Sequence, residues 1–140
     1  MRFLLDTNVL SEPVRPDPDP GLVGWLEQRS SLDLCISVLT LGEVRKGILL
    51  LPDGRRRERL HQWLGAELTR QFTDRVLPVD EAVSLAWGRL AAEGRRSGRP
   101  LPVIDGLLLA TAAVHGLTFV TRNDRDGSER GVPVVNPWSG

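Results

Sequence analysis

Short apolar runs alternate with longer amphipathic stretches along the chain. The apolar runs predict strands over residues 2–5, 33–38, 76–79 and 118–121, with a candidate fifth strand over 132–135. The first, second and fourth runs are nearly continuous instead of alternating, which is typical of strands buried on both faces. Such strands occur in parallel sheets whose two faces are covered by helices.

The stretches between the strands predict helices, which begin at Asp19-Pro20 and at Asp80 and otherwise extend over residues 40–51, 55–72 and 103–114. Residues 6–8 are predicted to form a turn, and the prolines between residues 13 and 20 a loop. This alternation predicts an α/β fold with three layers. Its central, mainly parallel sheet has four to five strands flanked by helices, in a single domain over residues 1–140.

Composition excludes several classes of protein. The 18 basic and 18 acidic residues cancel, so any contact with nucleic acid must come from a local patch and not from net charge. The only cysteine, Cys35, lies in an apolar run, so we expect neither an internal disulfide nor a zinc motif. No leader-like segment follows Met1, and the longest apolar run, near residues 107–114, is too short to span a membrane. We therefore expect a cytoplasmic protein with no membrane partner.

Three acidic residues stand out because their sequence neighbours are apolar: Asp6 after the first strand, Glu43 in the helix over 40–51, and Asp105 at the start of the last helix. Each has a purely structural alternative. Asp6 can cap a turn, Glu43 can lie on a solvated helix flank, and Asp105 can interact with the helix dipole. In a parallel sheet, however, the carboxyl ends of the strands form one edge, where binding sites lie. Together the three acids predict a common pocket.

Neighbouring carboxylates repel one another, so their convergence predicts a divalent cation between them. The chain has no histidine or cysteine cluster to compete, and oxygen ligands favour Mg²⁺ or Mn²⁺. Such an ion polarises a phosphodiester and lowers the pKa of water for in-line attack. The polar residues after the fourth strand supply candidates for one further position, namely Asn123, Asp124 and Asp126.

Four segments, in this order, resemble the motifs of PIN-domain proteins: residues 4–10 (LLDTNVL), 40–47 (TLGEVRKG), 105–112 (DGLLLATA) and 121–123 (TRN). Within that family the chain is most similar to VapC toxins of the FitB-like branch, with which it shares the opening DTNVLSEP and the terminal Asn136-Pro137-Trp138. The fourth motif departs from the pattern, because Gly127 stands where many members have an aromatic residue.

The resemblance implies that the three-layer fold is a PIN-like sandwich. It also implies the toxin of a type II toxin–antitoxin system, which is a Mg²⁺- or Mn²⁺-dependent endoribonuclease that hydrolyses RNA. It further implies a homodimer that is inhibited by a cognate antitoxin. This homodimer contacts operator DNA only through the antitoxin. The implied catalytic residues are Asp6, Glu43, Asp105, Asn123 and Asp126, the first three as metal ligands. Thr7, Asn8 and Thr121 are implied to surround the metal ligands, where Thr7 and Thr121 would hydrogen-bond the carboxylates and hold them in position.

Other interpretations stay open. DNA as the substrate requires the same metal chemistry. A PIN-like protein that only binds a partner is the other alternative, and the intact Asp6, Glu43 and Asp105 argue against it. A haloacid dehalogenase-type phosphatase is disfavoured, because its motif needs an acid where Asn8 stands and a lysine that Lys46 is badly placed to supply. Two arginine groups are either solvated faces or contacts to RNA phosphates: Arg55, Arg56, Arg57 and Arg59, and Arg95, Arg96 and Arg99.

Overall fold

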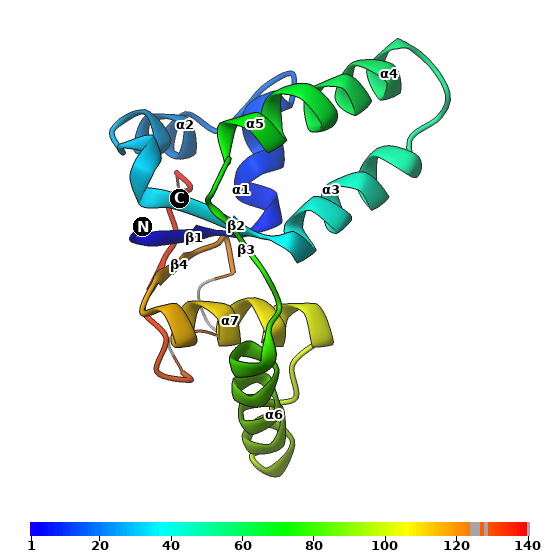
Figure 1. Cartoon of the computed structure of the whole chain (residues 1–140). Helices are drawn as coiled ribbons and strands as arrows, with labels where there is room; N and C mark the ends of the chain where they lie inside the picture. Colours follow the sequence, from blue (N-terminus) through cyan, green and yellow to red (C-terminus); the bar gives the residue numbers. More distant parts are fainter. Residues whose placement is uncertain (124–126, 128, 140) are drawn as a thin grey trace.

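A parallel sheet forms the centre of the molecule. The computed structural model describes residues 1–123, 127 and 129–139. The sheet consists of β1 (Phe3–Leu5), β2 (Leu34–Ser37), β3 (Val76–Leu77), β4 (Thr118–Val120) and β5 (Val134–Val135). The strand order is β3-β2-β1-β4-β5, and every neighbouring pair is parallel. The predicted parallel sheet is confirmed, including its fifth strand. Strands β1 to β4 are labelled in Figure 1.

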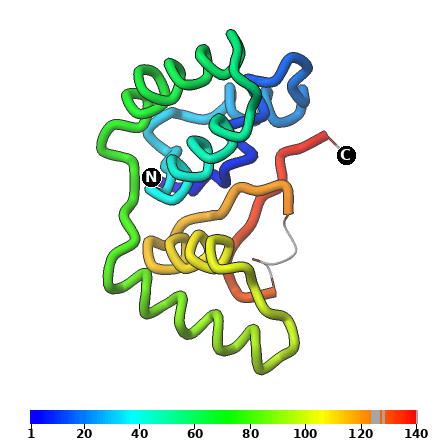
Figure 2. Tube along the Cα trace, turned by 90° about the vertical axis from the view of Figure 1, so that its right-hand side faces the viewer, coloured from blue at the N-terminus to red at the C-terminus, as the bar shows by residue number. Residues whose placement is uncertain are grey.

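Helices cover the two faces of the sheet, which gives the predicted three layers (Figures 1 and 2). One layer contains α1 (Thr7–Ser11), α2 (Pro20–Glu27), α3 (Val38–Leu49), α4 (Arg55–Gln62), a π-helical segment (Trp63–Leu68) and α5 (Thr69–Gln71). The other layer contains α6 (Glu81–Arg96) and α7 (Val103–His115).

The strands separate the core into two clusters because successive side chains of a strand point to opposite faces. Phe3 and Leu5 of β1 pack with the layer of α1 to α3, whereas Leu4 between them packs with α6 and α7. The same alternation places Ile36 in the first cluster and Cys35 in the second. This two-sided burial explains why the runs in the sequence are continuously apolar.

Several predicted boundaries shift for local reasons. The turn predicted at residues 6–8 is wrong, because the Asp6 carboxylate accepts the Thr7 amide hydrogen bond and starts the short helix α1. Helix α3 begins at Val38, two residues early, because Ser37 Oγ accepts a hydrogen bond from the Leu39 amide at 3.0 Å. The predicted caps of α2 and α6 are confirmed, each with an aspartate side chain as acceptor.

The remaining differences concern length. The helix predicted over 55–72 is continuous from Arg55 to Gln71, but its middle is π-helical. Strands β3 and β5 are two residues each, and α6 extends to Arg96 into the predicted connection.

Cys35 is fully buried, as expected, and burial raises the pKa of its thiol to about 11. Within the described residues, no helix combines the length and the apolar character needed to span a membrane.

Candidate active site

Asp6 lies where β1 ends and α1 begins, and both of its carboxylate oxygens are held. Oδ1 accepts a hydrogen bond from the Thr7 amide at 2.8 Å. Oδ2 accepts one from the Thr121 hydroxyl, also at 2.8 Å. Thr121 follows β4, the parallel neighbour of β1, so the register of the sheet brings the two residues together. A carboxylate oxygen has room for a second partner, so Asp6 can still bind a cation.

Glu43 is connected to Asp6 through Thr7. Thr7 Oγ1 donates a hydrogen bond to Glu43 Oε1 at 2.6 Å, while the Thr7 amide donates to Asp6. Glu43 is half-buried on α3, so the alternative of a fully solvated helix flank does not hold. Thr7 and Thr121 therefore each donate a side-chain hydrogen bond to one of the acidic residues. One threonine thus fixes the relative orientation of two acidic side chains from different elements.

Asp105 lies in the first turn of α7 and faces the same cavity as Asp6. This cavity of about 40 Å³ is lined by Asp6, Asp105, Leu109, Phe119, Thr121, Asn123 and Gly127. Its volume exceeds the roughly 10–15 Å³ that one water molecule needs. Asp6 comes from the end of β1 and Asp105 from the start of α7 in the other layer, and the two acids line one cavity.

The donors at this cavity fit a hard divalent cation, with one difference from the prediction. Mg²⁺ is usually held by one or two carboxylates and several waters, which the pair Asp6 and Asp105 can provide. However, no three acidic, histidine or cysteine side chains among the described residues lie close enough together to hold one ion. Glu43 lines a neighbouring cavity instead. The structure therefore joins Glu43 to the site through Thr7 and not as part of a compact group of three carboxylates.

The other predicted residues occupy different positions. Asn123 lines the cavity, and its backbone amide donates a hydrogen bond to Thr121 Oγ1 at 3.2 Å. Asn8 lies in α1, and its buried Oδ1 has no hydrogen-bond partner within the described part of the chain. Asp124 and Asp126 lie outside the described residues.

Comparison with known families now decides the assignment. The family model of the PIN domain matches residues 3–130, which include every cavity-lining residue named above. The chain belongs to the PIN-domain family. The resemblance expected from the four motifs is thereby confirmed.

Several known proteins resemble this PIN domain along almost its whole length. The Toxin FitB of Neisseria gonorrhoeae is 37% identical over 136 residues, which cover 97% of this chain and 98% of that protein. The VapC ribonuclease Y4jK of Sinorhizobium fredii is 33% identical and covers 97% of both chains. The solved structure of FitAB bound to an IR36 DNA fragment matches with a TM-score of 0.93 at 35% identity, over 99% of this chain and 96% of that one. Solved structures similar to this PIN domain are FitAB and VapBC toxin–antitoxin complexes.

A larger cavity adjoins the acidic residues of the PIN domain. It has a volume of about 300 Å³ between α1, α3 and α4, and Thr7, Glu43, Arg15, Arg56 and Trp63 are among its lining residues. Arg15 and Trp63 were not among the residues predicted for the site. Arg15 lies in an irregular proline-rich segment, where no periodicity reports which way a side chain points.

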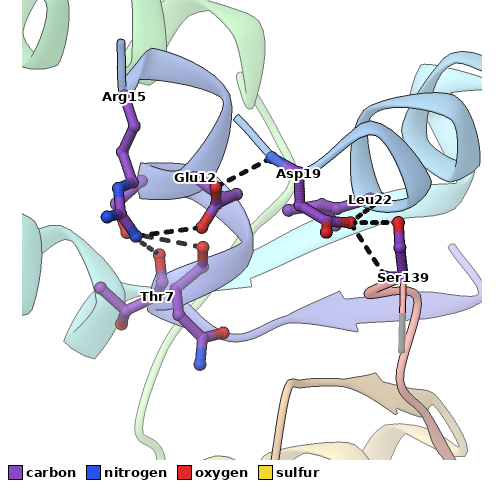
Figure 3. A network of polar contacts seen from close by, with 8 residues as sticks. Thr7, Glu12, Arg15, Asp19, Leu22 and Ser139 are labelled. Carbon is purple, nitrogen blue, oxygen red and sulfur yellow. Dashed lines mark hydrogen bonds and ion pairs between the residues drawn. The ribbon is translucent and has the colours of Figure 1, made fainter. Parts of the chain in front are cut away.

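A buried acid that sequence analysis also missed holds this region together (Figure 3). Glu12 is only 7% exposed and accepts hydrogen bonds from the Asp19 amide at 3.0 Å and the Arg15 guanidinium at 3.4 Å. Asp19 in turn accepts hydrogen bonds from Leu22 and Ser139. The Leu22 hydrogen bond, chiefly, lowers the pKa of Asp19 below its ordinary value. Glu12 thus connects Arg15, at the large cavity, to the start of α2.

Proposed function

We propose that this PIN domain is the toxin of a type II toxin–antitoxin pair and acts as a Mg²⁺- or Mn²⁺-dependent endoribonuclease. The observation that carries the proposal is the shared cavity of Asp6 and Asp105, with both Asp6 oxygens oriented by hydrogen bonds. Relatives that carry the names toxin and VapC ribonuclease, at more than 30% identity over nearly the whole chain, support it.

Asp6 and Asp105 would hold the cation directly, with Asn123 and water filling other positions. When bound, such a cation neutralises phosphodiester charge and lowers the pKa of water. Thr7 and Thr121 orient Asp6, so less reorganisation is needed when ligand and substrate arrive.

Glu43 has a different role in this proposal. Its Oε1 accepts the Thr7 hydroxyl, while among the described residues no hydrogen bond to Oε2 is formed. A carboxylate oxygen in this position can accept a hydrogen bond from the attacking water and receive its proton. Asp126 remains a proposed further residue of the site. In this arrangement, Glu43 would take the proton of a water molecule that attacks from the side of the cavity of Asp6 and Asp105.

The proposed partners follow from the relatives. An RNA substrate implies action in the cytoplasm, and the toxin–antitoxin complexes among similar structures support a cognate antitoxin. We also propose a homodimer, with operator DNA contacted only through the antitoxin. DNA as the substrate is the nearest alternative, because the same chemistry cleaves both backbones.

The decisive experiment compares Asp6→Asn with Asp33→Asn. Both aspartates are half-buried, but Asp33 lies next to the amino end of β2, at the opposite edge of the sheet. We expect Asp6→Asn to abolish Mg²⁺-dependent cleavage of RNA without unfolding the protein, because it removes a charged metal ligand. Asp33→Asn should cleave RNA as the unmodified protein does. EDTA should stop cleavage by Asp33→Asn and by the unmodified protein.

Cleavage should be measured on matched RNA and DNA oligonucleotides, with circular dichroism to confirm folding. Retained Mg²⁺-dependent cleavage by Asp6→Asn would refute the assignment of the site. Preferential cleavage of the DNA oligonucleotide would replace RNA as the substrate and leave the metal site standing.

A further inference from the structure

The C-terminal segment 136–139 lies at the carboxyl ends of the strands, the same end of the sheet as Asp6. It is held there by residues far away in the sequence. Ser139 donates to Asp19 Oδ2 through both its amide and its hydroxyl, each at 3.0 Å. Ser139 Oγ also accepts the Gly21 amide hydrogen at 2.8 Å. Figure 3 shows Ser139 beside the start of α2, where Asp19 also accepts from Leu22.

This approach is so close that it requires a glycine. A Cβ atom at Gly21 would lie 2.3 Å from Ser139 Oγ and 2.9 Å from the Ser139 backbone nitrogen. Both distances are shorter than real contacts of a Cβ atom. The segment is therefore docked in a defined position against α2, although it follows the last strand and ends the described chain.

The docked segment holds Arg122 from two directions. Asn136 Nδ2 donates to the Arg122 carbonyl at 3.1 Å, and Asn136 Oδ1 accepts the Trp138 amide at 3.0 Å. The Arg122 guanidinium carbon lies 5.7 Å from the centre of the Trp138 ring, within the range of a cation–π interaction. Trp138 itself packs against the core cluster below α2.

Arg122 immediately follows Thr121, whose hydroxyl orients Asp6. Among the described residues, the Arg122 guanidinium makes no hydrogen bond or ion pair. It lines a cavity of about 400 Å³ together with Trp138, Arg15, Glu12, Asp17, Pro18, Asp19 and Pro20. Glu12 and Asp19 already accept hydrogen bonds, and Arg15 pairs with Glu12. Arg122 thus follows the residue that orients Asp6, and within the described part of the chain its guanidinium stacks on Trp138 with its hydrogen-bond donors unused.

We propose that Arg122 binds a phosphate of the RNA strand next to the cleaved bond, and that Trp138 and Asn136 are positioning residues that hold it there. This inference rests on the proposed ribonuclease function. Arginine suits the role because its planar donor fork matches the oxygens of a phosphate, and stacking on Trp138 limits the conformations that binding must select.

The test is the binding of a short fluorescein-labelled single-stranded RNA of mixed sequence by the full-length protein in EDTA, at several salt concentrations. Without metal the RNA stays intact, so binding is read separately from cleavage. Arg122→Gln should weaken binding and reduce the slope of log K against log salt by about 0.7, the value for one phosphate contact on a single strand. Arg2→Gln is the matched control, because Arg2 is also exposed and also stacks on an aromatic ring, Phe3, but at the opposite edge of the sheet.

The positioning role has its own readout. Asn136→Ala and Trp138→Leu should each weaken RNA binding, and each should have no further effect in a protein that already carries Arg122→Gln. Asn136 is exposed, so its variant remains informative if Trp138→Leu unfolds. An unchanged salt slope in Arg122→Gln, or an equal change in Arg2→Gln, would overturn the inference while the nuclease assignment stands. Absence of Mg²⁺-dependent RNA cleavage by the unmodified protein would instead remove the proposed function itself.

Discussion

The hydroxyl of Thr121 offers a sharp test of how the site is organised. Thr121 is 1% exposed and donates to Asp6 Oδ2 at 2.8 Å. Thr121→Val keeps the shape of the side chain and removes this donor, together with the weaker acceptor contact to the Asn123 backbone amide at 3.2 Å. We expect the Asp6 carboxylate to rotate more freely and to bind a divalent cation less well.

The size of the effect follows from the hydrogen bond. A hydrogen bond to a charged group contributes roughly 1.5–3 kcal/mol. Each 1.36 kcal/mol corresponds to about a factor of ten. Loss of a partner behind a metal ligand typically lowers metal affinity or activity about 10–100-fold. The two estimates agree, so Thr121→Val should lower Mn²⁺ affinity and kcat/KM by about 10–100-fold.

Thr111→Val is the matched control. Thr111 is also buried, but its hydroxyl donates to the Leu107 carbonyl of its own helix at 2.8 Å and does not face the site. Its loss should lower the free energy of unfolding by about 1 kcal/mol or less, with Mn²⁺ affinity unchanged. Calorimetric titration with Mn²⁺, a fluorogenic RNA assay and urea unfolding separate these effects. The reasoning fails if Thr121→Val keeps full Mn²⁺ affinity, or if Thr111→Val loses as much.

Two further predictions concern arginines and the buried thiol. Arg56 lines the cavity that contains Glu43, whereas Arg96 ends α6, so Arg56→Gln should reduce RNA affinity and its salt slope more than Arg96→Gln; equal losses in both variants would contradict this. Because burial raises the pKa of Cys35 to about 11 and the thiolate is the reactive form, a disulfide reagent at neutral pH should label Cys35 only after unfolding, and rapid labelling of the folded protein would show that the core opens there.

Much of the fold could be predicted because the local pattern and the tertiary structure agree. Strands such as β1 are buried on both faces, and their sequences are accordingly apolar at every position. Asp19 and Asp80 start helices by capping their amide groups, which a sequence reveals directly. The short helix α1 was missed because five residues are too few to show a helical period.

The site was predictable in part for the same reason. The position of Asp6 and Asp105 at one cavity follows from the order of strands and helices, which the sequence indicates. The distance between carboxylates does not follow from topology, so the expected compact group of three acids was not found among the described residues. The contact between Asp19 and Ser139 joins residues 120 positions apart, and no local pattern reports such a pairing.

The central claim is that Asp6 and Asp105 together hold a divalent cation. Its most direct test is the anomalous difference map of a crystal soaked in MnCl₂. We predict a manganese peak within the cavity lined by Asp6, Asp105 and Asn123, at coordination distance from an oxygen of each aspartate. A well-ordered site with no peak there, or a peak bound by neither aspartate, would contradict the account.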